Sequence, residues 1–135
     1  MKRGARGFTL LELLVVVLII GLLTGIVAPR FMAQINRSEQ TTARAQMDAL
    51  AKALQAYRID LGRYPSTEQG LRALVESVGE PRWQGPYLQG GVPKDPWERP
   101  YQYRHPGSQG RDFDLSSLGR DRRVGGSGQD ADLVY

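Results

Sequence analysis

The segment of residues 8–28 constrains this chain most, because it is apolar along almost its whole length and carries a single charge, Glu12. Its 21 residues would rise about 31 Å as an α-helix, which matches the hydrocarbon core of a bilayer, about 30 Å thick. The segment is therefore predicted to cross a membrane at some stage. A carboxylate in that environment costs about 2.5–3.5 kcal/mol on insertion scales, so Glu12 is expected to have a partner or a function.

Three cations, Lys2, Arg3 and Arg6, precede this segment and are typical of the start of a secretory signal. An ordinary signal peptide continues with a short apolar region and a small-residue cleavage site behind it. Here the small residue, Gly7, stands in front of the apolar segment, and the segment is longer. The sequence therefore predicts cleavage on the cytoplasmic side of the membrane, with the rest of the chain on the periplasmic or extracellular side.

The junction G-F-T-L-L-E-L at residues 7–13 resembles the class III leader junction of type IV pilins and pseudopilins. The resemblance implies that a membrane prepilin peptidase cuts after Gly7, removes the leader 1–7 and methylates the new amino-terminal Phe8. Cleavage would leave an amine on Phe8 about 6 Å along a helix axis from Glu12. That amine, or the amine of a neighbouring subunit, could neutralise the carboxylate. The family favours the neighbour, and such a pair would set the register of adjacent subunits in an assembly.

Downstream of the membrane segment, apolar residues recur at alternating spacings of four and three, the pattern of one face of an α-helix. They are Ala43, Met47, Leu50, Leu54, Tyr57 and Leu61. Gly62 and Pro65 then supply the signals that end a helix. We therefore expect one helix over residues 8–61, with a transmembrane half at residues 8–28 and a periplasmic half at residues 29–61.

Gly21, Gly25 and Pro29 interrupt the first half of this helix. Glycine weakens the turns around it, and a proline inside a helix removes a backbone hydrogen bond. Two compatible interpretations follow. The small residues allow close helix packing within the membrane, and the segment can bend or melt when the subunit leaves the bilayer for a fibre core.

The chain that follows the long helix is enough for one small domain. Ser66 or Thr67 is expected to cap a second helix that ends near Val78. Alternating apolar residues predict strands near residues 100–104 and 111–116, joined as a hairpin on the carboxy-terminal half of the long helix.

Between the predicted second helix and the hairpin, residues 81–100 are rich in proline and glycine. This segment also holds Trp83, Tyr87 and Trp97. Three large aromatic side chains in such a segment predict an ordered loop, anchored by its rings to the rest of the domain.

Composition excludes several classes of function. The chain has no cysteine, so it has neither disulfides nor zinc–thiolate sites. Its single histidine, His105, stands before a proline and is expected in an exposed loop. Because three of the cations belong to the leader, the remainder is close to neutral and lacks the basic surface of a nucleic-acid-binding protein. No nucleophile, base or cofactor motif stands out, and we expect no enzyme.

Motifs along nearly the whole chain resemble the major pseudopilin of type II secretion. They are G-R-Y-P-S-T-E-Q-G-L at residues 62–71, G-P-Y-L at 85–88, P-K-D-P-W at 93–97 and S-L-G-R-D at 117–121. The resemblance implies an α+β, type IV pilin-like fold. In that fold the long amino-terminal helix packs on a small antiparallel sheet, and residues 62–135 form an α+β globular part with a glycine- and aspartate-rich carboxy-terminal loop.

The resemblance also implies a function. The chain would be the major structural subunit of the type II secretion pseudopilus, a periplasmic homopolymer that drives folded proteins across the outer membrane. Before assembly it would be a single-pass protein in the lipid of the inner membrane, with its carboxy-terminal domain in the periplasm. The implied partners are other copies, minor pseudopilins, the inner-membrane assembly platform and the prepilin peptidase. The alternative is a type IV pilin that serves adhesion, motility or DNA uptake.

The carboxy-terminal loop, residues 117–133, concentrates three aspartates among glycines. Ca²⁺ takes about six to eight oxygen ligands from carboxylates and carbonyls. Aspartate near glycine is also typical of ordinary turns. The resemblance to major pseudopilins, whose matching loop binds calcium, implies a Ca²⁺ site here. The implied ligands are the carboxylates of Asp121, Asp130 and Asp132 and the carbonyls of Leu118 and Arg123.

This loop departs from the family pattern, because G-R-D-R stands at residues 119–122 where G-A-D-G is usual. Nearby arginines weaken a site for a dication electrostatically. The alternative is a calcium-independent loop that is held by arginine–aspartate pairs.

Overall fold

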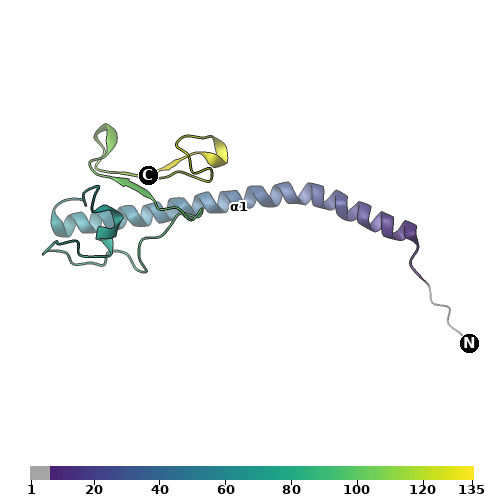
Figure 1. The fold of residues 1–135 in the computed structure, drawn as a ribbon, viewed down its shortest axis with the longest axis horizontal. Coiled ribbons are helices and arrows are strands. Elements are labelled where there is room, and N and C mark those ends of the chain that lie inside the picture. The colour runs from purple at the N-terminus through teal and green to yellow at the C-terminus, as the bar shows by residue number, and fades with distance from the viewer. Residues whose placement is uncertain (1–6) are drawn as a thin grey trace, which may run out of the picture. The chain divides into compact units, whose positions relative to one another are not determined.

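The computed structural model describes residues 7–135 (Figure 1). The residues outside this range include the predicted leader cations Lys2, Arg3 and Arg6. The chain forms two compact units, one up to Arg37 and one over Ser38–Tyr135. A single α-helix, α1 (Leu10–Leu61), makes up most of the first unit and begins the second.

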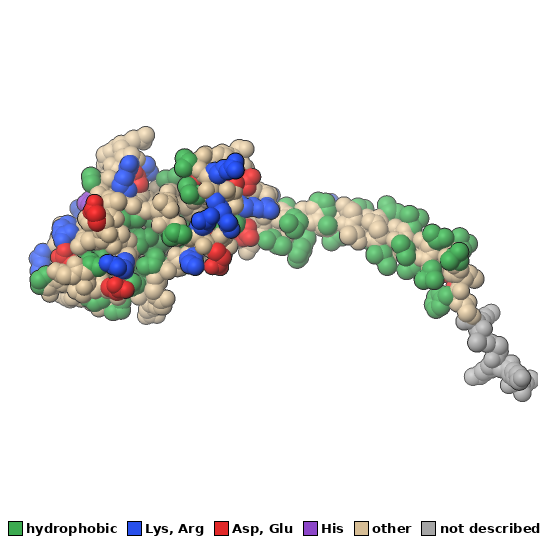
Figure 2. Space-filling model, in the orientation of Figure 1, with side chains coloured by type: hydrophobic (Ala, Val, Ile, Leu, Met, Phe, Trp, Pro, Cys, Tyr) green, Lys and Arg blue, Asp and Glu red, His purple; other side chains and the backbone are tan. Residues whose placement is uncertain are grey.

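In the first unit, consecutive apolar side chains of α1 are exposed, and Figure 2 shows those on the face in view. The exposed set includes Leu10, Leu14, Val17, Leu22 and Phe31. The helix is long and apolar enough to cross a membrane, and none of its apolar window is buried. Because large apolar surfaces are unfavourable in water, this unit needs an apolar environment, which a bilayer or a bundle of helices supplies.

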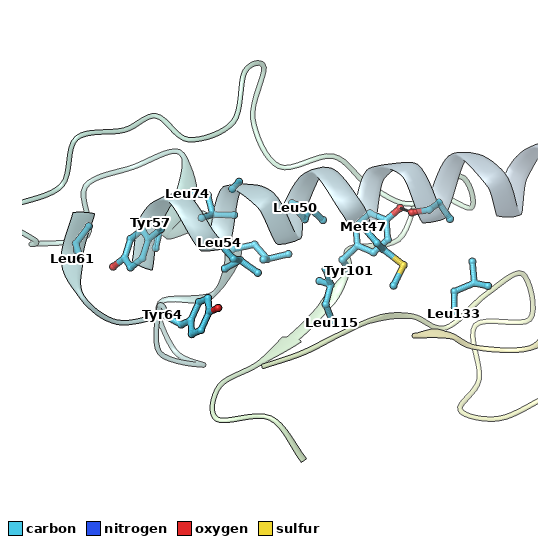
Figure 3. Packing of buried hydrophobic residues seen from close by; sticks show 14 residues of the cluster. Met47, Leu50, Leu54, Tyr57, Leu61, Tyr64, Leu74, Tyr101, Leu115 and Leu133 are labelled. Carbon is cyan, nitrogen blue, oxygen red and sulfur yellow. Dashed lines mark hydrogen bonds between the residues drawn. The ribbon is translucent and has the colours of Figure 1, made fainter. Parts of the chain in front are cut away.

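The second unit is built on the carboxy-terminal half of α1, whose predicted apolar stripe is buried (Figure 3). The six stripe residues, from Ala43 to Leu61, are at most 4% exposed. Later segments close the core over this stripe with Tyr64, Leu74, Tyr101, Leu115 and Leu133. The core of this unit therefore lies between α1 and the chain that follows it.

Gly62 ends α1 as the sequence predicts. Its φ of +78° lies in the left-handed region that glycine adopts without strain, and its amide donates to the Arg58 carbonyl at 2.7 Å. Arg82, from the loop that follows, donates to the Leu61 carbonyl at 2.8 Å. These two bonds satisfy carbonyls that a helix end otherwise leaves free.

The predicted second helix is wrong in type and length. The segment holds a short 3₁₀ helix, η1 (Gly70–Leu74), which ends four residues before Val78. An α-helix through Val78 would need the Leu74 carbonyl as an acceptor. The Tyr87 amide already donates to this carbonyl at 2.7 Å. The returning loop thus stops the helix, an effect that no local pattern can indicate.

Three short antiparallel strands form one sheet in the order β1-β2-β3. They are β1 (Gln102–Arg104), β2 (Asp114–Ser117) and β3 (Leu133–Val134). The predicted hairpin is confirmed as β1 and β2, with Tyr103 opposite Leu115. Strand β3 has no sequence signal, because two residues are too few for an alternation to show. Two further 3₁₀ turns, η2 (Ser108–Gly110) and η3 (Gly128–Asp130), lie in the connecting loops.

The proline-rich loop between η1 and β1 is ordered and anchored by its aromatic rings, as predicted. Each ring donates a hydrogen bond to another segment: Trp83 Nε1 to the Ala73 carbonyl at 2.8 Å, the Tyr87 hydroxyl to Asp60 Oδ2 at 2.8 Å, and Trp97 Nε1 to Glu39 Oε2 at 3.1 Å. All three rings also pack against the core. The loop therefore contacts α1 at Glu39 and at Asp60, near the two ends of the part of this helix that belongs to the second unit.

Candidate functional site: the helix start and the carboxy-terminal loop

Thr9 and Glu12 close the start of α1 through a reciprocal pair of hydrogen bonds. The Thr9 hydroxyl accepts from the Glu12 amide at 3.2 Å, and Glu12 Oε2 accepts from the Thr9 amide at 3.1 Å. This capping box satisfies two amides that a helix start leaves free. The helix therefore begins at Leu10, two residues later than the sequence predicts. Glu12 thus has a hydrogen-bond partner within its own chain.

The predicted cleavage point lies in non-helical chain in front of α1. Gly7 and Phe8 are exposed, and the exposed fraction of Phe8 is 84%. A Cβ added at Gly7 would meet no atom within 4 Å. Proteolysis favours exposed segments outside regular structure, and residues 7–9 are such a segment.

Gly21, Gly25 and Pro29 follow one another at intervals of one helical turn along α1. Gly21 and Gly25 line a shallow groove between larger apolar side chains, and the helix continues through all three residues without a break. The amide that Pro29 lacks would have bonded the Gly25 carbonyl, so the ladder misses one bond at this point. The Thr24 hydroxyl donates to the Ile20 carbonyl at 2.7 Å, a contact that often bends helices. The structure thus places the three predicted residues on one weakened stretch of α1.

The carboxy-terminal loop folds back on itself at two glycines. Gly119 and Gly126 both have positive φ; Gly119 lies against the backbone of Asp130 and Ala131, and Gly126 lies against that of Asp130. A Cβ at Gly119 would stand 2.7 Å from the Ala131 carbonyl oxygen, and one at Gly126 would overlap the Asp130 carbonyl oxygen. Larger residues fit neither place, so these glycines allow the two arms of the loop to touch.

Two of the three aspartates in this loop hold its backbone. Asp121 Oδ1 accepts from the Arg123 amide at 3.0 Å, and Asp132 Oδ2 accepts from the Gly125 amide at 2.9 Å. The third, Asp130, is exposed. Within the described part of the chain, no group of three or more His, Cys, Asp or Glu side chains is placed to hold a metal ion. A metal here would therefore need backbone carbonyls as well as carboxylates.

The loop contains a buried carboxylate oxygen, Asp132 Oδ1. This oxygen has no hydrogen-bond partner among the described residues. Two further oxygens, the Asp130 carbonyl and Asp121 Oδ2, both lie beside Gly126, where an added Cβ would overlap the first and stand 3.3 Å from the second. Burying an oxygen without a hydrogen-bond partner costs folding free energy unless a cation or a water molecule binds it. This set of donors fits a hard cation such as Ca²⁺.

The other two implied ligands differ in their surroundings. Leu118 directly follows β2 and is half-buried, whereas Arg123 is exposed. Within residues 7–135, no ion pair joins Arg122 or Arg123 to an aspartate. The alternative of a loop held by arginine–aspartate pairs therefore lacks support at these two arginines.

A buried carboxylate, Asp95, fixes the place where this loop begins. Asp95 is 2% exposed, its Oδ2 accepts from the Ser117 hydroxyl at 2.6 Å, and its Oδ1 accepts from the amides of Trp97 and Arg99 at 3.1 and 2.8 Å. The Ser117 hydroxyl in turn accepts from the Gly119 amide at 3.3 Å. Asp95 thereby ties its own loop to the end of β2.

Some of these arrangements have sequence signals that apolar patterns alone miss. T-L-L-E at residues 9–12 and S-T-E-Q at residues 66–69 both fit the capping-box pattern. The second box also forms, with N···O distances of 2.9 and 3.2 Å, and it closes the turn that leads into η1, whose own N-cap residue is Gln69. D-P-W at residues 95–97 fits an Asx-turn. The contact of Asp95 with Ser117, across 22 residues, has no such signal.

Asp114 accepts a hydrogen bond from a backbone amide and contacts two arginines at the hairpin. Its Oδ2 accepts from the Ser108 amide at 2.9 Å and from Arg104 at 2.7 Å, and Arg111 lies 3.1 Å from its Oδ1. The Ser108 amide, followed by the two arginines, holds the pKa of Asp114 below its ordinary value of 3.8. The charged form of Asp114 therefore stabilises the pairing of β1 with β2.

Comparison with known proteins covers both units of the chain. The prokaryotic N-terminal methylation motif matches residues 2–28, and the family described as type II secretion system (T2SS), protein G matches residues 30–135. The chain belongs to the type II secretion system protein G family. The type II secretion system core protein G of Pseudomonas aeruginosa is 44% identical over 98% of this chain and 95% of its own length. The Vibrio cholerae protein of the same name is 42% identical over 97% of this chain and 91% of its own length.

A solved member of the protein G family has the same fold. The crystal structure of the major pseudopilin from the type 2 secretion system of enterohaemorrhagic Escherichia coli matches with a TM-score of 0.61 and 36% identity, over 76% of this chain and 90% of that one. The match confirms the predicted class, a long helix packed on a three-stranded antiparallel sheet. These matches favour type II secretion over the type IV pilin alternative, and the protein G family is one of structural subunits, not of enzymes.

Proposed function

We propose that this protein G family member is the major structural subunit of a type II secretion pseudopilus. One observation carries the proposal: the folded unit matches protein G, and the helix in front of it exposes an apolar surface that a soluble monomer would not keep. Copies of the subunit would pack their exposed helices as the core of a periplasmic fibre. Assembly of this fibre would drive folded proteins across the outer membrane.

Before assembly, the same helix would anchor the subunit in the inner membrane, with the second unit in the periplasm. The exposed chain at residues 7–9 would present the cleavage point Gly7 to a prepilin peptidase, which would methylate Phe8. Other copies, minor pseudopilins and the inner-membrane platform would be its assembly partners. Mass spectrometry of the mature chain tests the processing step: N-methylated Phe8 supports it, and an intact Met1 or a cut behind residue 25 contradicts it.

We propose two different roles for Glu12, and one substitution separates them. In the single subunit its carboxylate accepts from the Thr9 amide. In the fibre it would neutralise the amino-terminal amine of a neighbour's Phe8, and a buried pair of this kind favours one stagger of adjacent subunits over others. Glutamine keeps the capping-box hydrogen bond but has no charge. Glu12→Gln therefore isolates the role in assembly.

The test places each variant in a strain from which the gene has been deleted, and measures processed subunit, fibres and released exoprotein. We expect Glu12→Gln and Glu12→Leu to insert into the membrane but to reduce the number of fibres at least about tenfold. The reason is that the amino-terminal amine of Phe8 then stays buried without a carboxylate partner. Thr9→Val is the matched control. It removes the cap at a cost of about 1 kcal/mol, keeps the charge and should still assemble.

Normal fibres from Glu12→Gln would remove the register contact from the proposal. Loss of fibres from Thr9→Val as well would assign the effect to helix capping. If the deletion leaves exoprotein release intact, the chain is not a subunit of a type II secretion pseudopilus.

We further propose that the carboxy-terminal loop binds Ca²⁺. The buried Asp132 Oδ1, which has no hydrogen-bond partner among the described residues, supports this, and Asp121 Oδ2 and the Asp130 carbonyl beside Gly126 are further oxygens of the loop. The carbonyls of Leu118 and Arg123 are the remaining candidate donors. Bound calcium would supply the positive charge that joins the two arms of the loop. The chain itself would bring the two arms close together, because Gly119 and Gly126 leave room for this approach.

Calorimetry and thermal unfolding with and without calcium test this site. A ligand at about one hundred times its Kd adds about 2.7 kcal/mol to the stability of the folded unit, so the midpoint should rise clearly. Asp132→Asn should abolish the rise. Asp48→Asn, an exposed aspartate of α1 that pairs with Lys52, should leave it unchanged. No rise at about millimolar calcium would remove the metal from the proposal.

A further inference from the structure

A groove in the second unit has no part in the functions proposed above. It is an open cavity of about 690 Å³ between η1, residues 92–94 and strand β1. Apolar side chains such as Leu71, Val75 and Val92 line it. A groove with an apolar lining and a few polar groups is the usual form of a binding site for a peptide or small molecule.

Tyr103 lines this groove, and the pairing of the strands gives the direction of its backbone groups. Strand β1 is an edge of the sheet, since β2 is the one strand of residues 7–135 that pairs with it. The Tyr135 amide donates to the Leu115 carbonyl at 3.0 Å, so the backbone of Leu115 faces β3 and not β1. Tyr103, the register partner of Leu115, therefore sits in a pair without mutual hydrogen bonds. Its N–H and C=O are directed away from β2, toward the outer edge.

The same edge is covered on both sides of Tyr103. On one side Lys94 bridges Pro100, and on the other the Thr67 hydroxyl bonds both the amide and the carbonyl of His105 at 3.0 Å. Proteins usually cover the edges of their sheets in this way. The uncovered stretch is thus short, and it lies where the groove lies.

The charged side chains that line the groove, Arg72 and Lys94, are both cations. Arg72 lies 3.6 Å from Glu76, an exposed pair of the kind that contributes little. Lys94 is exposed and forms no ion pair with the residues that the structure describes. A partner that carries a carboxylate would complement this charge.

We propose that this groove docks a short extended segment of a partner protein, in which a carboxylate stands next to an apolar side chain. The backbone of the segment adds to the sheet edge at Tyr103, as in β-strand addition. Its apolar side chain covers Leu71 and Val92, and its carboxylate pairs with Lys94. The groove lies outside the helix start and the calcium-type loop. A result that contradicts this proposal therefore leaves the pseudopilus proposal unaffected, and the reverse also holds.

The experiment uses the full chain in nanodiscs of a zwitterionic lipid and a fluorescein-labelled pentapeptide of alternating valine and glutamate. Fluorescence anisotropy should show saturable binding. Lys94→Glu should weaken this binding about tenfold, because it removes one attraction and adds a repulsion. The matched control is Arg44→Glu, the same change of charge on the exposed side of α1, and it should bind as the parent chain does. The same peptide with an N-methylated central residue, which lacks one backbone donor, should bind at least about tenfold more weakly.

Three results would overturn the proposal. They are the absence of saturable binding, an equal loss in Lys94→Glu and Arg44→Glu, and undiminished binding of the N-methylated peptide. The second would indicate attraction by net charge alone, and the third would remove the backbone contact at Tyr103. The near-ultraviolet circular dichroism of Trp83 and Trp97 verifies that each variant is folded.

Discussion

The two halves of α1 share one helical geometry, but the first half exposes its apolar side chains and the second half buries an apolar stripe. Between Leu10 and Val27, every large apolar side chain is at least 46% exposed. Between Ala43 and Leu61, the stripe that faces the core is at most 4% exposed. The residues after Leu61 supply the partners of the second half. The described residues supply no such partners for the first half, so its apolar surface needs a cover from outside, such as lipid or other helices.

This difference separates two kinds of stability. Helices in proteins are held mainly by the packing of an apolar face and not by intrinsic propensity. The second unit has this packing within one chain, so its unfolding free energy is a property of the subunit. The first unit lacks it, so its stability depends on the surrounding lipid and on the concentration of partner helices.

The largest expected effect tests whether the two halves are energetically independent. Leu54→Ala should destabilise the second unit by about 3–5 kcal/mol, because Leu54 is fully buried. Leu18→Ala, in the exposed half, should leave that value unchanged within about 0.5 kcal/mol. Urea unfolding of the full chain in micelles, followed by the fluorescence of Trp83 and Trp97, reports on the second unit alone. Equal costs for the two variants would contradict the division of α1.

Substitution of Asp95 should cause the next largest loss of unfolding free energy. Asp95→Ala leaves the Ser117 hydroxyl and two amides without their acceptor, and should cost about 2–3 kcal/mol of unfolding free energy. Asp48→Ala is the control, since its pair with Lys52 is exposed and worth less than about 0.5 kcal/mol. Chemical unfolding with the same tryptophan signal measures both. A small effect of Asp95→Ala would show that water can replace this carboxylate.

Glycine substitutions should have opposite signs in the two halves. Gly62→Ala should destabilise the second unit by about 1–2 kcal/mol, because an L-residue is strained at a φ of +78°. Gly25→Ala lies inside the helix and should stabilise it by about 0.5–1 kcal/mol. Amide hydrogen exchange around residues 21–29 in micelles measures the second effect. Exchange that is already slow in the parent chain would contradict a soft segment at Pro29.

The smallest effect is a pH dependence at the hairpin. Because the folded-state pKa of Asp114 is lowered, its stabilisation is fully present above its ordinary value and is lost as the pH falls through the lowered value. The melting temperature of the parent chain should therefore decline below about pH 4. Asp114→Asn should flatten that decline and lower the melting temperature at neutral pH. Parallel curves for the two proteins would assign the decline to other carboxylates.

Much of the fold follows from patterns within one segment. The apolar segment 8–28, the stripe that ends at Leu61 and the stop at Gly62 each depend on residues a few positions apart, and each is found in the structure. The β1–β2 hairpin is predicted for the same reason. The motif at Gly7, Phe8 and Glu12 locates the candidate site, and T-L-L-E at residues 9–12 also signals the capping role of Glu12, although apolar patterns alone miss it.

The sequence by itself determined the exposed apolar helix, its capped start and the buried face of its second half. Helical periodicity and hydrogen bonds within one turn suffice for these features. The tertiary structure alone decided that η1 ends at Leu74, that β3 joins the sheet, and that Asp95 holds Ser117. These features depend on distant segments that compete for the same carbonyl, sheet edge or hydroxyl, and the outcome of that competition is set only when the core has closed.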